Sequence, residues 1–344
     1  MISFASDYLE GAHPAVLDAL VRTNMEQLKG YGTDVYCESA GRRIREACGK
    51  PDADVFFVAG GTQTNQLIIS TVLRGYQAVV AAKTGHVAVH EAGAIEYTGH
   101  KVIELPSKNG KLAAEDVRDL ISAFYADENH QHMPYPGMVY VSFPTEYGTL
   151  YSRKELEALH SVCLDYSIPL FIDGARLGYG LESREADVTL PELASLCEVF
   201  YIGGTKVGAL CGEAVVFCGM PAPDHFVTLT KQRGAMLAKG RLIGVQFDAL
   251  FTDGLYFDIS RRAIEAAEEI KAIFKNEGYS FLVDSPTNQQ FVIIEDEKLE
   301  KLKGKVGYSF WEKYGEKSSV VRFAASWATT HDQIEYLKKA LRDI

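Results

Sequence analysis

The chain has 344 residues, more than a single hydrophobic core usually supports, so two domains are expected. Hydrophobic residues make up 47% of the sequence and charged residues 24%, as in a globular protein with a large core. The formal net charge of -11 argues against a nucleic acid or an anionic membrane as a partner, and no apolar run approaches the roughly 20 residues of a transmembrane helix.

The first part of the chain gives few structural signals. Residues Met1–Asp7 lack the basic start and the apolar core of a signal peptide. The cysteines form no CxxC pair and predict neither a zinc site nor a disulfide framework, so we expect a cytoplasmic protein without a bound metal. Apolar positions spaced as on one helix face predict a helix over Pro14–Lys29. The polar, glycine-broken stretch Gly30–Glu38 is expected to be a loop, either a surface turn or a part of a binding site.

Seven short apolar runs follow, and several are separated by segments with helical periodicity. The runs lie at Val55–Val58, Ala78–Ala82, Val102–Leu105, Val139–Phe143, Leu170–Ile172, Val199–Ile202 and Ala214–Phe217. The helical segments include Thr62–Arg74, Ala114–Tyr125 and Arg153–Tyr166. Wholly apolar strands that alternate with helices indicate a mostly parallel sheet covered on both faces, so we predict an α/β fold with about seven strands. Ligands of such sheets lie beyond the carboxyl ends of the strands.

The pattern changes after Pro221-Ala222-Pro223. One helical stretch is expected to carry Lys231, Arg233, Lys239 and Arg241, and another to run from Tyr256 to Asn276. Strand-like segments at Phe281–Val283, Phe291–Ile294 and Val320–Ala324 precede a last helix at His331–Arg342. We therefore predict a large domain over residues 1–244 and a smaller α+β domain over residues 245–344.

Lys206 stands just after the sixth apolar run, behind Gly203-Gly204-Thr205. An apolar strand on one side and small residues on the other can lower the pKa of its amine and make it a nucleophile, as a carbonyl cofactor requires. The glycines are expected to leave the backbone free to bend. On this stretch alone, a surface lysine in a turn is the alternative.

Two earlier strand ends carry related chemistry. Gly61 and Thr62 open a helix after the first run and could hold a phosphate, although the same residues could serve only as a helix cap. His86 follows the second run and could lie flat against an aromatic ligand ring. A metal ion shared by His86 and His90 is the weaker alternative, because no third ligand stands at a suitable spacing.

The fifth run ends at Asp173, and Arg176 follows three residues later. A carboxylate after three apolar residues is costly to bury unless it meets a cation such as a pyridinium nitrogen; capping the next turn is its alternative role. The planar guanidinium of Arg176 suits a carboxylate. A phosphate anchor, a ring stack, a nitrogen partner and a nucleophilic amine are together what pyridoxal phosphate (PLP) needs, so the conjunction predicts PLP as cofactor.

The sequence resembles the low-specificity L-threonine aldolases, which belong to the fold-type-I PLP enzymes and to the β-eliminating lyase group. The resemblance covers nearly the whole chain and is strongest up to about residue 218. It rests on Ala5-Ser6-Asp7, Asp34-Val35-Tyr36, Gly61-Thr62-Gln63-Thr64-Asn65, His86 with Glu91-Ala92-Gly93-Ala94, Ile172-Asp173-Gly174-Ala175-Arg176 and Thr205-Lys206. It implies a fold like that of aspartate aminotransferase and an assembly of identical subunits, a tetramer or at least a dimer.

The resemblance also implies roles for individual residues. Lys206 would be the Schiff-base lysine, Asp173 the partner of the ring nitrogen and His86 the stacking residue. The phosphate would be held by Gly61, Thr62 and Thr205. The substrate-binding residues would be Ser6, Arg176 and Arg322, which take the carboxylate, and Tyr36, which would reach a neighbouring subunit's site.

The activity implied is the cleavage of β-hydroxy-α-amino acids, such as L-threonine or L-allo-threonine, to glycine and an aldehyde. The base for the β-hydroxyl would be His132, His86 or an activated water. The chain departs from the family at Ser142-Phe143-Pro144-Thr145-Glu146-Tyr147-Gly148, where members usually have Glu-Asn-Thr-His-Asn. The alternatives are another PLP-dependent β-eliminating lyase or an aminotransferase acting on a small or aromatic amino acid, or a catalytically silent small-molecule binding protein.

Overall fold

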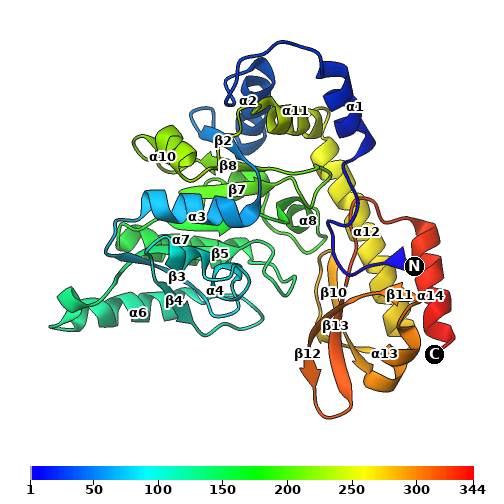
Figure 1. The fold of residues 1–344 in the computed structure, drawn as a ribbon. Helices are drawn as coiled ribbons and strands as arrows, with labels where there is room; N and C mark the ends of the chain where they lie inside the picture. The colour runs from blue at the N-terminus through cyan, green and yellow to red at the C-terminus, as the bar shows by residue number, and fades with distance from the viewer. Residues whose placement is uncertain (1) are drawn as a thin grey trace.

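A computed structural model describes residues 2–344 of the chain (Figure 1). The elements of the first part are β1 (Ile2–Ser3), α1 (Pro14–Thr23), α2 (Val35–Cys48), β2 (Asp54–Val58), α3 (Gly61–Val72), β3 (Gln77–Ala82), α4 (His86–Val89), α5 (Ala94–Tyr97), β4 (Val102–Leu105), α6 (Ala114–Ala126), η1 (His130–His132), β5 (Tyr135–Ser142), α7 (Arg153–Asp165), β6 (Leu170–Asp173), α8 (Leu177–Leu181), α9 (Leu190–Leu193), β7 (Val199–Gly203) and β8 (Glu213–Phe217). The remaining elements are α10 (Phe226–Gln232), α11 (Arg241–Leu250), α12 (Leu255–Asn276), β9 (Ser280–Val283), β10 (Gln289–Glu295), α13 (Asp296–Leu302), β11 (Val306–Gly307), β12 (Ser309–Tyr314), β13 (Ser318–Ala324) and α14 (His331–Arg342).

A seven-stranded sheet forms the centre of the larger part, in the order β2-β8-β7-β6-β5-β3-β4. The strands from β7 to β4 run parallel to one another, and β8 is antiparallel to both of its neighbours. Each of the seven apolar runs forms one of these strands. The predicted mostly parallel α/β sheet is therefore confirmed.

Helices cover both faces of this sheet, which is why its inner strands are apolar throughout. One face packs against α3, α4, α5 and α10, through residues such as Leu67, Val87 and Phe226. The opposite face packs against α2, α6, α7, α9 and α11 and against the first half of α12. The carboxyl ends of the parallel strands thus remain the open edge, where Lys206 and Asp173 lie.

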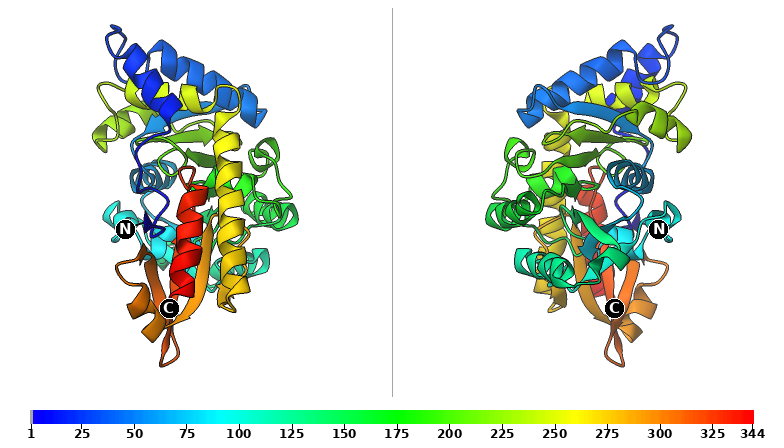
Figure 2. Two further views of the ribbon diagram at one scale, coloured as in Figure 1. Left: turned by 90° about the vertical axis from the view of Figure 1, so that its right-hand side faces the viewer. Right: turned by 90° about the vertical axis from the view of Figure 1, so that its left-hand side faces the viewer.

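A second, four-stranded antiparallel sheet in the order β12-β13-β10-β9 lies in the C-terminal part. Helices α12 and α14 lie side by side over it, as both views show (Figures 1 and 2). α12 joins the two cores: its residues up to Ile264 belong to the core of the large sheet, and those from Ala266 onward to the smaller core. The division after residue 244 stays a prediction.

The N-terminal segment crosses to the C-terminal part before α1 begins. β1 pairs in parallel with β11, and Phe4 exchanges backbone hydrogen bonds with Gly307 and Ala324. This path carries Ser6 and Asp7 to the space between the two sheets, where both are buried. Residues at opposite ends of the sequence therefore meet in one place.

Three sequence predictions of secondary structure are wrong. The first helix ends at Thr23 instead of Lys29. Part of the expected loop Gly30–Glu38 is the first turn of α2, because Asp34 caps that helix by accepting hydrogen bonds from the N–H groups of Tyr36 and Cys37. The stretch from Lys231 to Arg241 is not one helix, because glycines interrupt it between α10 and α11.

None of the helices within residues 2–344 combines the length and apolar character needed to cross a membrane.

Candidate active site

Lys206 lies in the loop between β7 and β8. The two glycines before it allow close backbone packing rather than bending: a Cβ on Gly203 would collide with the carbonyl oxygen of Ala175, and one on Gly204 would lie 2.7 Å from the carbonyl oxygen of Gly212. Neither glycine has a positive φ angle. The expectation of a freely bending backbone is therefore wrong. Gly203 instead lets the lysine loop pack closely against the loop that follows Asp173, and Gly204 lets it pack against Gly212.

The amine of Lys206 has no hydrogen-bond or ion-pair partner among residues 2–344. Burial, followed by the positive charge of Arg176, lowers its pKa from the ordinary 10.5 to about 8. A fall of this size raises the neutral fraction at pH 7 by roughly 300-fold, and the neutral amine is the nucleophile. Lys206 is thus suited to bond covalently with a carbonyl group.

We expect the rate of PLP uptake by the apoprotein to rise with pH and to level off above about pH 8. Below that pH most of the Lys206 amine carries a proton and cannot attack, and above it the neutral form dominates. Stopped-flow absorbance at a series of pH values measures this rate. A profile that still rises steeply at pH 10 would contradict the lowered pKa.

Asp173 ends β6 and is buried. Its two oxygens accept four hydrogen bonds, from the hydroxyls of Tyr140 and Tyr201, each at 2.6 Å, from Asn65 at 3.0 Å and from the Ala175 N–H at 2.9 Å. Burial alone would raise the pKa of this carboxyl, but the charge of His86 and the tyrosine hydrogen bonds outweigh it and lower the pKa. The group is therefore an ionised carboxylate held in a fixed position, as the partner of a cationic ring nitrogen must be.

His86 begins α4, at the end of the neighbouring β3. Its Nδ1 lies 2.8 Å from Oε1 of Glu91, and the same oxygen accepts a hydrogen bond of 2.8 Å from Asn65. Because Asn65 also binds Asp173, one amide connects the histidine and the aspartate. The ring of His86 is thereby oriented beside Asp173, as a stacking role requires.

The N-terminus of α3 fits a phosphate. Its N-cap residue, Gly60, provides no side-chain cap, so the N–H groups of Gly61 and Thr62 are free to bind an anion. A Cβ on Gly61 would lie 3.2 Å from the hydroxyl of Tyr201, the tyrosine that binds Asp173. Tyr201 therefore lies between the start of α3 and Asp173 and contacts both.

Thr205 is engaged differently from the prediction. Its hydroxyl donates to the carboxyl of Glu213 at 2.8 Å and accepts from the Gly212 N–H at 3.1 Å. Burial raises the pKa of Glu213 to about 8. As placed here, Thr205 fixes the lysine loop to β8, and binding of a phosphate would require its hydrogen bond to Glu213 to change.

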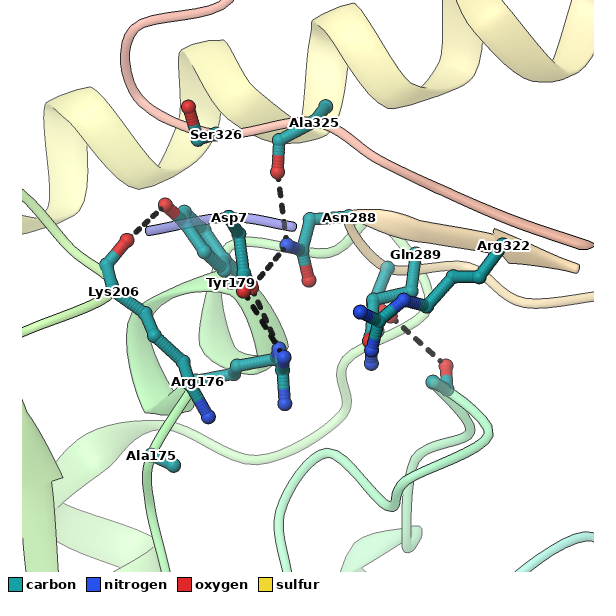
Figure 3. Close-up of polar contacts among 12 residues, drawn as sticks. Asp7, Ala175, Arg176, Tyr179, Lys206, Asn288, Gln289, Arg322, Ala325 and Ser326 are labelled. Atoms are coloured by element: carbon teal, nitrogen blue, oxygen red, sulfur yellow. Dashed lines mark hydrogen bonds and ion pairs between the residues drawn. The ribbon is translucent and has the colours of Figure 1, made fainter. Parts of the chain in front are cut away.

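Arg176 is held by Asp7 through two parallel hydrogen bonds, from Nε to Oδ2 at 2.6 Å and from Nη2 to Oδ1 at 3.0 Å (Figure 3). Asn288 donates to Oδ2 of the same aspartate at 2.9 Å. This arrangement leaves Nη1 of Arg176 for a ligand. Ser6 directly precedes Asp7 in the chain, and its hydroxyl is buried without a partner among residues 2–344. Such orphaned groups are typical of a site that a polar ligand completes.

Arg322 on β13 faces Arg176 from the other side of the site (Figure 3). It donates to Oε1 of Gln289 and to the carbonyl oxygen of Ala5, each at 2.9 Å, while its Nε is buried without a partner within residues 2–344. Burial first, and then the charge of Arg176, lowers the pKa of Arg322. Two half-buried arginines close enough for the charge of one to lower the pKa of the other indicate a place for an anion.

Two predicted site residues lie elsewhere in the chain. His132 ends η1, which precedes the amino end of β5, whereas the site lies at the carboxyl ends of the strands. Within one chain His132 therefore lies away from Lys206 and Asp173, and its role as the base stays a prediction. Tyr36 begins α2 and donates to the carboxylate of Glu26 at 3.0 Å. Within one chain it contacts none of the other predicted site residues.

Several residues of the site were not assigned a role from the sequence. They are Asp7, Asn65, Glu91, Tyr140, Tyr201, Glu213 and Asn288. Three of them stand in the stretches that carry the family resemblance, so position alone could have suggested them. The two tyrosines could be found only from the pairing of the strands. Tyr140 lies on β5 and Tyr201 on β7, the two neighbours of β6, which carries Asp173.

Comparison with known proteins decides the family. A family model described as beta-eliminating lyase matches residues 3–296, most of the chain. The chain belongs to the β-eliminating lyase family. It is 28% identical to the low specificity L-threonine aldolase of Pseudomonas sp. (strain NCIMB 10558). The similarity covers 99% of this chain and 97% of the aldolase.

Solved structures agree. The threonine aldolase of Leishmania major is 39% identical to this β-eliminating lyase family member, with a TM-score of 0.96 and coverage of 100% of this chain and 99% of that chain. The aspartate aminotransferase of Thermus thermophilus, at 16% identity, shares the fold, with a TM-score of 0.71 over 99% of this chain and 90% of that chain. The predicted family and the fold-type-I architecture are thus confirmed.

The cofactor of this family is PLP, and the residues present fit it. The uncapped start of α3 offers N–H groups that would hold the phosphate, the ionised Asp173 would pair with the ring nitrogen, and Lys206 offers an unpaired amine for the carbonyl carbon. N–H donors suit the anionic phosphate, a carboxylate suits the cationic ring nitrogen, and a neutral amine suits the carbonyl carbon. No cluster of three or more possible metal ligands exists in the described residues.

Proposed function

We propose that this protein cleaves the Cα–Cβ bond of β-hydroxy-α-amino acids of the L-threonine and L-allo-threonine type, giving glycine and an aldehyde. The observation that carries the proposal is the convergence of Lys206 with two facing arginines, Arg176 and Arg322, at one edge of the sheet. The amine serves a carbonyl cofactor and the arginines an α-carboxylate. Similarity to threonine aldolases over nearly the full length supports the reaction type.

Each residue of the site would bind a different part of the cofactor, according to its charge. PLP, when bound, supplies an acceptor for the electron pair of the bond that breaks. Lys206 would hold its carbonyl carbon, Gly61 and Thr62 its phosphate, His86 the face of its ring, and Asp173 the protonated ring nitrogen. Asp173 remains ionised in this role because Tyr140 and Tyr201 hydrogen-bond its oxygens.

The carboxylate-binding residues determine which substrate bond is cleaved. Ser6, Arg176 and Arg322 would together bind the α-carboxylate of the substrate. The two hydrogen bonds that Arg176 donates to Asp7 hold its guanidinium in one orientation. Cleavage requires the Cα–Cβ bond to stand perpendicular to the cofactor ring, and a fixed carboxylate holds the substrate in that orientation. Binding and catalysis therefore depend on the same arginines.

Replacing Arg322 by alanine is expected to reduce kcat/KM about ten- to a hundredfold, through a higher KM and a lower kcat. The loss of a hydrogen bond to a charged group costs roughly 1.5–3 kcal/mol, and a loosely held carboxylate lets the scissile bond turn away from the perpendicular. Steady-state kinetics with L-threonine measure both parameters. A control is Arg261→Ala, which changes an exposed arginine away from the site. Kinetics of the Arg322 variant within twofold of wild type would remove Arg322 from the site.

A product assay tests the function. Purified protein with PLP is mixed with L-threonine, L-allo-threonine and bulkier β-hydroxy amino acids, and all products are quantified. The proposal expects equal amounts of glycine and aldehyde. Ammonia with a keto acid would show β-elimination instead, and a keto acid without ammonia would show transamination. Either of these product sets would overturn the proposal.

Assembly and compartment belong to the same proposal. Large apolar side chains are exposed at the end of the molecule formed by α1 and α2, including Val21 at 75%, Met25 at 88% and Val35 at 59%. These residues support assembly of identical subunits through this end, as a tetramer or at least a dimer, and a copy placed there would give Tyr36 access to a neighbour's site. The free state of all six cysteines supports a reducing compartment, the cytoplasm.

A further inference from the structure

Glu146 lies at the carboxyl edge of the large sheet, in the stretch where the sequence departs from the family pattern. It stands four residues beyond Ser142, the last residue of β5, which pairs in register with Asp173. Its Oε1 accepts a hydrogen bond of 2.8 Å from the backbone N–H of His86 and one of 2.7 Å from the hydroxyl of Ser142. These contacts fix the carboxyl between the histidine and the aspartate of the site.

The second oxygen of Glu146 is free. Oε2 has no hydrogen-bond partner among residues 2–344, and it is not one of the polar atoms that are fully enclosed without a partner. No lysine or arginine of the described chain lies within ion-pair distance of it. A largely buried carboxyl without a cation is costly to maintain, and such groups are typical of functional sites.

The groups around Glu146 shift the pKa of its carboxyl upward. Burial is the largest effect and raises the pKa of its carboxyl, and the charge of Asp173 on β6 acts in the same direction. The Ser142 hydrogen bond and the charge of His86 on α4 act against it without cancelling it. The other titratable groups facing it are the hydroxyls of Tyr140, Tyr147 and Tyr151. A general base works best when its pKa lies close to the working pH.

The other candidate bases are less suitable. His132 lies at the opposite edge of the sheet. His86 has Nδ1 engaged with Glu91, and its ring is needed against the cofactor. The ring of His90 lies 5.6 Å from that of His86 between centroids, but the residue is exposed and its ring nitrogens have no hydrogen-bond partner among residues 2–344. Glu146 alone combines a fixed position beside His86 with an unengaged oxygen.

We propose that Glu146 is the base that removes the proton of the substrate's β-hydroxyl. The proposal rests on the proposed function and names a catalytic residue for it. The O–H bond breaks, its proton moves to Oε2 of Glu146, and its electron pair becomes the second bond of the aldehyde C=O. The electron pair of the Cα–Cβ bond stays with the glycine fragment, whose Cα then takes up a proton from water to give glycine. Glu146 is left neutral and returns its proton to water after the aldehyde leaves.

Glu146→Gln tests the proposal with little change of shape. The amide oxygen can still accept from His86 and Ser142, but the group can no longer take a proton. We expect kcat for threonine cleavage to fall about 10²–10⁴-fold, which is the usual contribution of general-base catalysis. The acidic limb of the kcat/KM profile should disappear with it. Circular dichroism and the absorbance of bound PLP should match those of wild type.

Ser142→Ala is the matched second variant. It removes one hydrogen bond that stabilises the ionised form of Glu146, so the pKa of Glu146 rises. Because the base acts only above its pKa, we expect the acidic limb to move to higher pH while the plateau value of kcat stays within a few-fold. An unmoved limb in this variant would overturn the proposal even if Glu146→Gln failed to fold.

A partial reaction separates catalysis from positioning. Glycine has no β-hydroxyl, but the exchange of its α-hydrogen with deuterated water, followed by NMR, still needs PLP, Lys206 and the arginines. Glu146→Gln is expected to keep this exchange within a few-fold of wild type while losing cleavage. Equal losses of both reactions, or unchanged cleavage, would overturn the proposal. If the wild-type protein exchanges glycine but releases none from threonine, the proposed function itself fails, and this assignment fails with it.

Discussion

Lys206→Ala is expected to lower turnover by at least about a thousandfold and to remove the absorbance of bound PLP near the border of the visible and ultraviolet. The amine is the proposed covalent attachment of the cofactor, and its pKa of about 8 makes it a nucleophile near neutral pH. The fold should remain, because this amine makes no hydrogen bond or ion pair within residues 2–344. In one preparation, absorbance measures bound PLP, kinetics measure turnover and circular dichroism measures the fold.

Lys83→Ala is the control for this variant. Lys83 also follows a strand of the large sheet, β3, but its side chain is exposed. Its removal should leave turnover and absorbance unchanged. A Lys206→Ala protein that kept PLP in a borohydride-reducible bond would show that a different lysine carries the cofactor.

Asp173→Asn is expected to lower the rate far more than the PLP content. An opposite charge within about 4–6 Å of an ionisable group shifts the pKa of that group by roughly 1–3 units. Loss of the carboxylate beside the ring nitrogen should therefore cost about ten- to a thousandfold in rate. An amide cannot keep the ring nitrogen protonated, and its single oxygen cannot accept all four hydrogen bonds that Asp173 accepts. Kinetics at saturating PLP, with the cofactor content measured in parallel, separate the two effects.

Tyr201→Phe is the comparison for Asp173→Asn. It removes one hydrogen bond from Asp173 but keeps its charge and three other partners, so the loss of rate should be smaller. If Asp173→Asn turned over as fast as wild type, Asp173 would act only as a cap for the Ala175 N–H, to which it also binds. That outcome would leave the ring nitrogen without a partner on β6.

The sequence predicted correctly that the residues following the apolar strands would meet at one edge of the sheet. Lys206, Asp173 and His86 each follow an apolar run, and the carboxyl ends of parallel strands meet at one edge regardless of the details between them. The same rule could not supply Tyr140 and Tyr201. Their hydroxyls reach Asp173 only because β5, β6 and β7 are adjacent and in a particular register, which single strands do not reveal.

The remaining differences come from contacts distant in sequence. Asp7 meets Arg176 because the N-terminal segment crosses to β11 and returns, a path that no local pattern encodes. The resemblance gave His132 as a candidate base, but η1 lies before β5, whereas Lys206 and Asp173 follow the carboxyl ends of their strands. Glu146 was visible only as a departure from the family pattern. Its importance comes from the hydrogen bond to His86, which lies 60 positions away in the chain.

The most direct test of the central claim, that the cofactor is held at Lys206 within one site, is to locate it chemically. The PLP-loaded protein is reduced with borohydride and digested, and the modified peptide is identified by mass spectrometry. We expect the cofactor on Lys206, and less of it there when L-allo-threonine is added before reduction, because the substrate amine displaces the lysine. Cofactor on any other lysine, or on none, would contradict the assignment of this site.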